Sequence, residues 1–180
     1  TQVKEYRGRL MRIEERIGIL LKERSLKLAL AESCTGGLVG HRITNIPGSS
    51  DYYQGSVTAY AYEAKRKILG VNPQTLLDYG AVSRETVLEM AYGVRAAFAG
   101  DETPIDQIVG VSISGIAGPG GGMPGKPVGL VWVGLSAADG RWAWYKIWGG
   151  DRVANKRHSA QWALNLLQGY LTGKLPPEKH

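Results

Sequence analysis

The sequence of 180 residues has a single cysteine, Cys34, and only three histidines. One cysteine excludes an intramolecular disulfide and any metal site built from several cysteines. The histidines, His41, His158 and His180, are far apart in the sequence, and none stands in a metal-ligand pattern such as HExxH. We therefore expect neither a metal ion nor another cofactor.

Long apolar runs are also missing. No stretch approaches the roughly 18 consecutive apolar residues that a membrane-spanning helix needs. The segment from Thr1 to Arg24 is rich in charged side chains and lacks the apolar core and cleavage site of a signal peptide. Together with the lone cysteine, these absences favour the cytoplasm and argue against a membrane partner.

The composition is that of an ordinary globular chain. Hydrophobic residues make up 43% and charged residues 21%, which excludes the disordered classes. The length is typical of one domain, and we find neither an internal repeat nor a linker. We predict one domain over residues 1–173 and a polar tail over residues 174–180.

The formal net charge of +6 favours anionic partners. The basic residues are scattered, however, and aromatic residues do not alternate with them as on a platform for single-stranded nucleic acid. A solvated basic surface is the simplest interpretation. Charge alone does not distinguish a phosphorylated metabolite from nucleic acid, although nucleic-acid binding is the function that we rank last.

The first half of the chain predicts helices that alternate with strands. Apolar residues at helical spacing predict an amphipathic helix over residues 3–24. The elements expected after it are a strand over 26–31, a short helix to about Asn45, a strand from about Gly55 to Ala61, a helix over 62–69, a turn at Gly70 and Pro73, and a helix capped by Ser83.

The second half predicts a buried strand from Gln107 to Ser114 and then two strands, from Val128 to Ser136 and from Arg141 to Trp148. Asp139-Gly140 between these two is a strong hairpin signal. Asp151 can cap a last helix that runs to about Leu171. The order of elements predicts an α/β fold: a three-layer α/β/α sandwich with a mixed, mostly parallel sheet and an antiparallel hairpin at its edge.

Three loops follow the carboxyl ends of predicted strands: the turn at Ser33, the junction from Tyr60 to Lys65, and the glycine-rich loop from Gly115 to Gly122. Ligands bind at this edge of open α/β sheets. We therefore expect the three loops to converge on one site.

Ser33 lies where a strand gives way to a helix, which suits a nucleophile. The backbone N–H groups of Thr35, Gly36 and Gly37 follow it and could bind an oxyanion. Taken alone, Ser33 could equally be a helix cap. Cys34 is a rival nucleophile, although a small buried side chain is the favoured interpretation of a free cysteine.

Seven blocks of the sequence resemble the CinA carboxy-terminal domain family, whose standalone members are nicotinamide mononucleotide amidases. The blocks are Ala31–Gly37 (AESCTGG), Pro47–Ser50, Ala59–Lys65, Gly80–Ser83, Ser114–Gly121, Lys126–Gly129 and Gly150–Arg152. They occur in the family's order and cover roughly residues 10–171.

The resemblance implies an amidohydrolase of pyridine nucleotide salvage that converts nicotinamide mononucleotide to nicotinic acid mononucleotide and ammonia. It implies that Ser33 is the nucleophile, Lys65 its general base and Tyr60 a hydroxyl that assists the proton relay. A lysine serves as a base only if its pKa falls from about 10.4 toward neutrality. Without the resemblance, Lys65 would be read as a solvated helix lysine and Tyr60 as a core aromatic.

The glycine-rich loop is predicted to help bind the substrate. In this interpretation Ser114, Gly115, Gly118, Gly120 and Gly121 form a backbone cradle for a ribose phosphate. Arg152, near a helix N-terminus, would assist. The alternative is simply a long turn, and the phosphate-binding motifs GxxxxGK[ST] and GxGxxG are both absent.

Two positions depart from the family pattern. Ala61-Tyr62 replaces a Ser-Asn pair, and Ser114 stands where the family often has threonine. Loss of the asparagine amide bears on the orientation of Lys65 and on substrate preference. A non-catalytic nucleotide-binding or protein-interaction module is the alternative function. A homo-oligomer, with a dimer favoured, is the expected assembly.

Overall fold

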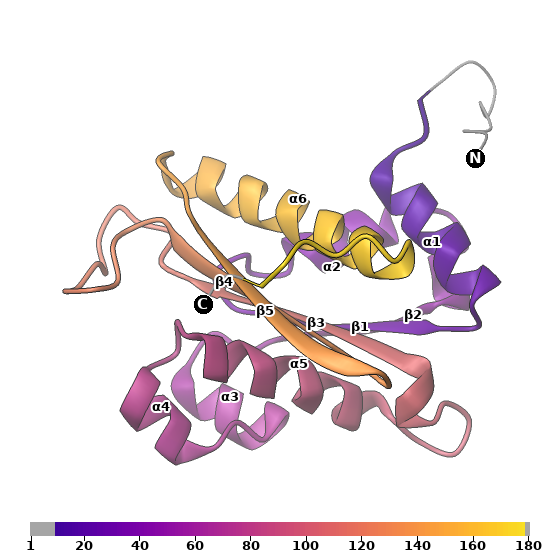
Figure 1. Cartoon of the computed structure of the whole chain (residues 1–180), viewed down its shortest axis with the longest axis horizontal. Coiled ribbons are helices and arrows are strands. Elements are labelled where there is room, and N and C mark those ends of the chain that lie inside the picture. The colour runs from indigo at the N-terminus through magenta and orange to yellow at the C-terminus, as the bar shows by residue number, and fades with distance from the viewer. Residues whose placement is uncertain (1–9, 179–180) are drawn as a thin grey trace.

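The computed structural model describes residues 10–178, which build a five-stranded sheet in the order β2-β1-β3-β4-β5 (Figure 1). The strands are β1 (Lys27–Glu32), β2 (Tyr53–Thr58), β3 (Ile108–Gly115), β4 (Leu130–Ala137) and β5 (Gly140–Ile147). β1 pairs in parallel with β2 and β3, whereas β4 is antiparallel to both β3 and β5. Only β4 therefore runs against the other strands, which confirms the predicted mixed sheet with a hairpin at its edge.

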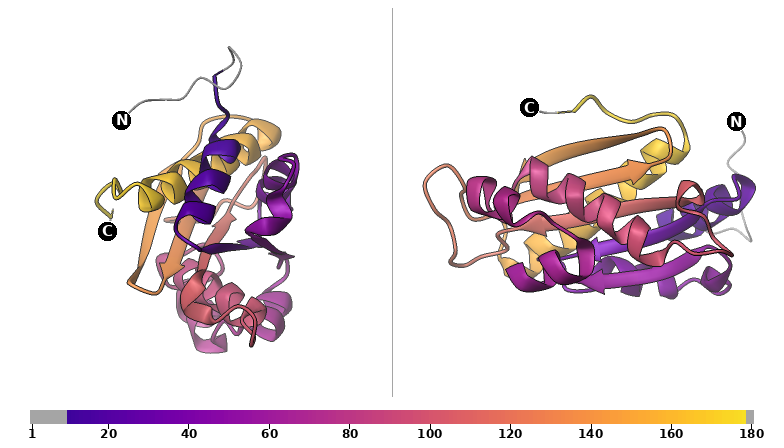
Figure 2. Two further views of the ribbon diagram at one scale, coloured as in Figure 1. Left: turned by 90° about the vertical axis from the view of Figure 1, so that its right-hand side faces the viewer. Right: turned by 90° about the horizontal axis from the view of Figure 1, so that it is seen from below.

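Helices cover both faces of the sheet, as the views from two further directions show (Figure 2). The helices on one face are α1 (Ile13–Glu23), α2 (Leu38–Thr44) and α6 (Arg152–Leu171), and those on the other are α3 (Tyr62–Leu69), α4 (Pro73–Tyr79) and α5 (Arg84–Phe98). This arrangement confirms the three-layer sandwich. None of the helices within residues 10–178 has the length and apolar character needed to cross a bilayer.

Alternation along β1 divides its side chains between the two layers. Leu28 and Leu30 pack into the core beneath α1, α2 and α6, and Ala29 and Ala31 face the opposite core. Small residues on that second face let α5 approach the sheet closely. A Cβ atom at Gly110 of β3 would lie 2.1 Å from the carbonyl oxygen of Ala91, so only glycine fits there.

Several predicted boundaries shift in the structure. β2 runs over Tyr53–Thr58, so the expected strand residues Tyr60 and Ala61 lie outside the sheet. The segment expected as a turn at Pro73 is helix α4, with the Asn72 side chain accepting the Gln74 amide at its start. The opening helix begins at Ile13, and the predicted stretch 3–9 lies outside the described residues.

The predicted caps and hairpin are confirmed. Ser83 accepts the Thr86 amide at the start of α5, and Asp151 accepts the Ala154 amide at the start of α6. Ala137 pairs with Gly140 across the two-residue hairpin turn.

The tail packs on β5 as far as residue 178. Glu178 accepts the backbone amide of Ala143 at 2.9 Å, and the Trp144 indole donates to the carbonyl of Pro176 at 3.1 Å. Residues 179 and 180 of the predicted tail lie outside the described residues.

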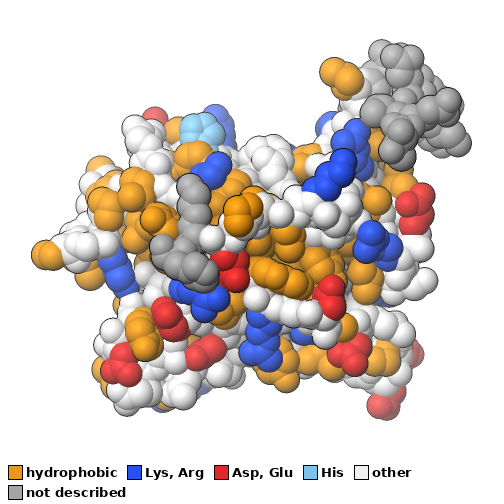
Figure 3. Space-filling model, in the orientation of Figure 1, with side chains coloured by type: hydrophobic (Ala, Val, Ile, Leu, Met, Phe, Trp, Pro, Cys, Tyr) orange, Lys and Arg blue, Asp and Glu red, His pale blue; other side chains and the backbone are white. Residues whose placement is uncertain are grey.

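Charged side chains of both signs are mixed on the face shown in Figure 3. Lysine and arginine lie among aspartate and glutamate there, with hydrophobic side chains between them. This face agrees with the scattered distribution of basic residues in the sequence.

Candidate active site

The register of the two parallel strands brings Ser33 and Lys65 together. Glu32, the last residue of β1, pairs with Thr58, the last residue of β2, and the Ala59 amide donates to the Glu32 carbonyl at 2.9 Å. The chain then turns into α3 at Tyr62, which carries Lys65 in its first turn. Two segments 32 residues apart therefore meet at the carboxyl edge of the sheet.

Lys65 forms hydrogen bonds to three oxygen atoms. Its Nζ donates to Ser33 Oγ at 3.1 Å, to the Ala59 carbonyl at 2.7 Å and to the Tyr60 carbonyl at 3.1 Å. The Lys65 side chain is 1% exposed and Ser33 is 8% exposed. The three acceptors fit the three protons of an ammonium group, and no carboxylate within residues 10–178 pairs with it.

Burial nevertheless favours the neutral amine. Desolvation lowers the pKa of Lys65 from its ordinary 10.5 to about 8. A neutral amine keeps two hydrogens, which suit the two carbonyls, and one lone pair, which is then left for the Ser33 hydroxyl proton. The geometry is that of a general base aimed at a serine.

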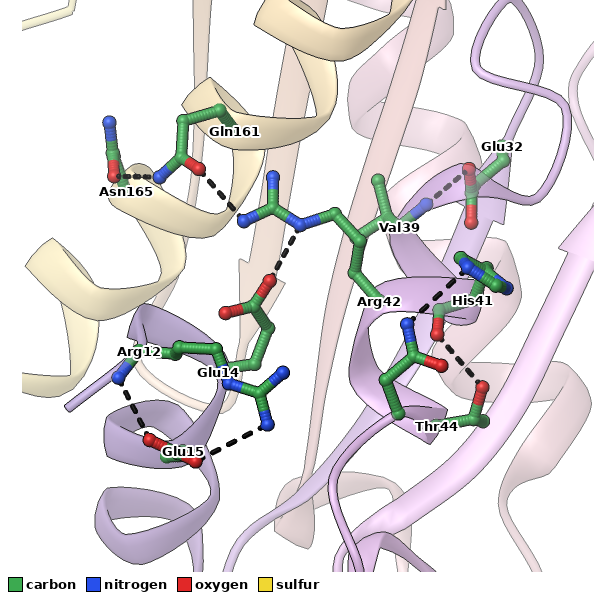
Figure 4. Close-up of polar contacts among 11 residues, drawn as sticks. Arg12, Glu14, Glu15, Glu32, Val39, His41, Arg42, Thr44, Gln161 and Asn165 are labelled. Carbon is green, nitrogen blue, oxygen red and sulfur yellow. Dashed lines mark hydrogen bonds and ion pairs between the residues drawn. The ribbon is translucent and has the colours of Figure 1, made fainter. Parts of the chain in front are cut away.

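Glu32 organises the turn that follows Ser33. Its carboxylate, fully buried, accepts hydrogen bonds from the Thr35 hydroxyl at 2.6 Å and from three backbone amides of Gly37, Val39 and Gly40 at 2.8–3.1 Å. The bond to Val39 is drawn in Figure 4. The N-cap residue of α2, Gly37, has no side chain to cap the helix, and Glu32 supplies that cap from the strand.

The backbone amides after Ser33 do not all remain available for a substrate. The Gly36 amide donates to the Ser33 carbonyl at 3.0 Å, and the Gly37 amide donates to Glu32. Within residues 10–178, the Thr35 amide has no acceptor. Of the three predicted oxyanion donors, Thr35 is thus the one that the structure leaves free.

Cys34 lies in the hydrophobic core beneath α2 and α6. Burial, with a smaller contribution from the nearby Glu32 carboxylate, raises the pKa of its thiol from 9.0 to about 12. A thiol of this pKa is protonated at neutral pH and is a poor nucleophile. Between the two neighbours, the structure favours Ser33 as the reactive group.

Tyr60 contacts the site through two different groups. Its carbonyl accepts from Lys65, whereas its phenol oxygen accepts from Arg152 Nη2 at 2.9 Å. Arg152 Nη1 also donates to the Gly118 carbonyl at 2.7 Å. Within residues 10–178 the phenol makes no hydrogen bond to Ser33 or Lys65, so its predicted place in a proton relay has no direct contact in this structure.

The glycine-rich loop divides into a held part and an exposed part. The buried side chain of Asn155 donates to the Ala117 carbonyl at 3.1 Å, and Arg152 holds Gly118. Gly120 and Gly121 are exposed, in the loop that projects beyond the end of the sheet in Figure 1. The structure therefore brings Gly118 to Arg152 but leaves Gly120 and Gly121 away from these contacts.

Ser114 and Gly115 end β3 beside the Ser33 turn. The Ser33 amide donates to the carbonyl of Ile113, which places Ser114 next to it. The Ser114 hydroxyl donates to the Ala81 carbonyl at 2.7 Å. A Cβ at Gly115 would lie 2.6 Å from the Val131 side chain, so this glycine permits close strand packing. Ser114 thus fixes the loop at Ala81.

Tyr62, which departs from the family pattern, makes no hydrogen bond to Lys65 within residues 10–178. Its phenol oxygen accepts the Ala81 amide at 3.3 Å. Ser114 holds the carbonyl of the same residue. The substitution therefore fixes the loop at Ala81 and leaves the three hydrogen bonds of Lys65 intact.

Two contributors escaped prediction from the sequence. Glu32 accepts backbone amides at the start of α2, and Asn155 donates to the glycine-rich loop. Glu32 could have been found only as a charged residue that ends a buried strand. Within residues 10–178, no three His, Cys, Asp or Glu side chains are grouped so as to hold a metal ion.

The fold and the paired Ser33 and Lys65 define an α/β protein with a serine–lysine pair at the carboxyl edge of its sheet. Residues 10–171 match the CinA C-terminal domain, and the chain belongs to this family. A CinA-like protein of Chloroherpeton thalassium is 50% identical over 166 residues, which cover 89% of this chain and 38% of that protein. A CinA-like protein of Salinibacter ruber is 48% identical over 152 residues, covering 84% and 35%.

The chain spans little more than a third of the length of these relatives. Solved structures match it over nearly their whole length. A CinA superfamily protein from Klebsiella pneumoniae aligns with a TM-score of 0.82 at 30% identity, covering 89% of this chain and 96% of that one. The competence/damage inducible protein CihA from Agrobacterium tumefaciens aligns with a TM-score of 0.77 at 36% identity, covering 89% and 95%.

Proposed function

We propose that this domain is an amidohydrolase that converts nicotinamide mononucleotide to nicotinic acid mononucleotide and ammonia. The hydrogen bond of 3.1 Å between the buried Lys65 amine and Ser33 Oγ carries the proposal. A buried lysine with a lowered pKa beside a serine is an arrangement suited to acyl transfer. Membership of the CinA C-terminal domain family supports the choice of a pyridine nucleotide amide.

In the proposed first step, Ser33 Oγ attacks the carboxamide carbon while Lys65 Nζ takes the hydroxyl proton. The oxygen of the tetrahedral intermediate becomes negative and accepts a hydrogen bond from the Thr35 amide. The C–N bond then breaks, and Lys65 returns the proton to the departing ammonia. The pyridinium charge withdraws electrons from the carboxamide and favours the attack.

In the second step, water attacks the acyl-enzyme with Lys65 as the base, and Ser33 leaves with its proton restored. Hydrogen bonds from Arg152 join Tyr60 and Gly118 at the edge of the site, where the three residues would border the sugar of the substrate.

Ammonia release from nicotinamide mononucleotide tests the proposal. We expect turnover by the wild type, loss of it in Ser33→Ala and Lys65→Ala, and near-normal turnover in Cys34→Ala, whose thiol is protonated and buried. Undiminished turnover in Ser33→Ala would contradict the mechanism. Binding of the nucleotide by the wild type without any ammonia release would instead support a non-catalytic binding module.

A further inference from the structure

A cavity begins directly behind the Ser33 turn. It has a volume of about 320 Å³ and lies between that turn and the first turns of α6. Residues 35–38 and His41 form one side, and Val153, Lys156 and Arg157 form the other. Arg42 of α2 links this helix to its neighbours, because it donates to Glu14 of α1 at 2.6 Å and to Gln161 of α6 at 2.8 Å (Figure 4).

The walls of this cavity carry positive charge and no acidic side chain. Lys156 and Arg157 form neither an ion pair nor a side-chain hydrogen bond with any residue in the range 10–178. The imidazole of His41, which contacts the Asn45 side chain, also lines the cavity. The Lys156 ammonium lies over the turn, because a Cβ built on Gly36 would be 3.7 Å from its Nζ. Unpaired cations around a hollow attract an anion.

A neighbouring cavity of about 500 Å³, beside the glycine-rich loop, is less suited to an anion. Its basic residue is Arg152, whose guanidinium already donates to Gly118 and Tyr60. The carboxylate of Asp151 also lines it and cancels the charge of Arg152. Both cavities include Val153, so they lie side by side, and the charge distribution distinguishes them.

We infer that the cavity between α2 and α6 binds the phosphate of the nucleotide substrate, with Lys156 as its principal ligand and Arg157 as a second cation. This inference rests on the proposed amidase function. The donors are side chains, because Glu32 already accepts the first amides of α2. The substrate's ribose separates its ring from its phosphate, so the phosphate needs a site next to Ser33 rather than at it.

Such a site would select nucleotides over nucleosides. The test compares kcat/KM for nicotinamide mononucleotide with that for nicotinamide riboside, which lacks the phosphate. We expect the ratio of the two values to fall about tenfold in Lys156→Met, the scale of one hydrogen bond to a charged group. Lys22→Met, which removes an exposed charge on α1, is the matched control and should leave the ratio unchanged. An unchanged ratio in Lys156→Met would overturn the inference.

A direct binding experiment separates this inference from the proposed function. Inorganic phosphate is titrated into the full chain while the backbone amide resonances of residues 35–38 are followed by NMR. Saturable shifts in the wild type that are lost in Lys156→Met support the site, whether or not ammonia is released. Absence of shifts in the wild type overturns it. A wild type that shows these shifts but releases no ammonia refutes the amidase alone.

Discussion

Lys65 Nζ lies 3.1 Å from Ser33 Oγ and is held from behind by the carbonyls of Ala59 and Tyr60. The two carbonyls accept hydrogen bonds from Lys65 in both of its protonation states. In the ammonium, the third hydrogen points to Ser33 Oγ, so Lys65 donates to the serine. In the neutral amine, the carbonyls occupy both hydrogens and the lone pair points to Ser33, so the serine hydroxyl donates to Lys65.

The proposed base predicts how activity depends on pH. Because attack requires the neutral amine and burial lowers the pKa of Lys65 to about 8, kcat/KM should rise about tenfold per pH unit below that value and level off above it. The measurement is ammonia release between pH 6 and pH 10. Unfolding temperatures recorded in the same buffers control for loss of structure. A midpoint near the ordinary lysine value of 10.5 would contradict the assignment.

Removing the Lys65 charge should stabilise the fold. The folded pKa of about 8 lies below the ordinary 10.5, so the unfolded chain binds more protons between these two values and stability rises with pH across that window. Lys65→Met lacks this dependence. We expect Lys65→Met to be inactive yet more stable at pH 7, by at most about 3 kcal/mol.

Urea unfolding at several pH values measures this effect. The difference between wild type and Lys65→Met, each in a Cys34→Ala background, is the informative quantity, because the buried tyrosines then contribute equally to both proteins and the thiol that interacts with Lys65 is absent. That difference should shrink as pH rises from 8 to 10.5. A variant that is less stable than wild type at pH 7 would show that the hydrogen bonds of Lys65 outweigh its burial.

Glu32 should matter for both stability and turnover. In Glu32→Gln one carboxylate oxygen becomes an amide that cannot accept, so a backbone amide of α2 loses its partner and the turn after Ser33 loosens. We expect a loss of about 1–3 kcal/mol in the free energy of unfolding and a reduced rate of ammonia release. Urea titration and the amidase assay measure the two effects.

Glu63→Gln is the matched control for this change. Glu63 forms an exposed pair with Lys67 at 2.7 Å on α3, and such surface pairs contribute little. If Glu32→Gln lowered the free energy of unfolding no more than Glu63→Gln does, the proposed role of the buried carboxylate would be wrong.

Much of the fold could be predicted from local patterns. Apolar alternation marks β1 and β3, the Asp139-Gly140 turn marks the hairpin, and Ser83 and Asp151 mark helix starts. Helix α4 was missed because it has only seven residues, although Asn72-Pro73 carries a start signal. The end of β2 was placed too late because β-forming residues continue to Tyr60, whereas the backbone there turns to Lys65.

The site was less accessible to prediction. Ser33 and Lys65 could be proposed from the family resemblance. The short distance between them, however, depends on the register between β1 and β2, which no local sequence pattern encodes. The same holds for the amides of Gly36 and Gly37, whose acceptors are set by the folded turn. From α6 the sequence indicated only Arg152, and the position of Lys156 over the Ser33 turn depends on how α6 packs in the folded chain.

The phenol of Tyr60 offers a test between two roles. A proton relay requires contact with Ser33 or Lys65, and its loss would lower kcat. In the structure, Tyr60 is 58% exposed, and its phenol oxygen accepts a hydrogen bond from Arg152 at 2.9 Å. We therefore expect Tyr60→Phe to raise KM severalfold with little change in kcat, because the mutation frees Arg152 and leaves the Lys65–Ser33 contact in place. Steady-state kinetics separates the two constants. The control is Tyr62→Phe, which removes only the hydroxyl group that accepts the Ala81 amide. A fall in kcat of a hundredfold or more in Tyr60→Phe alone would restore the relay.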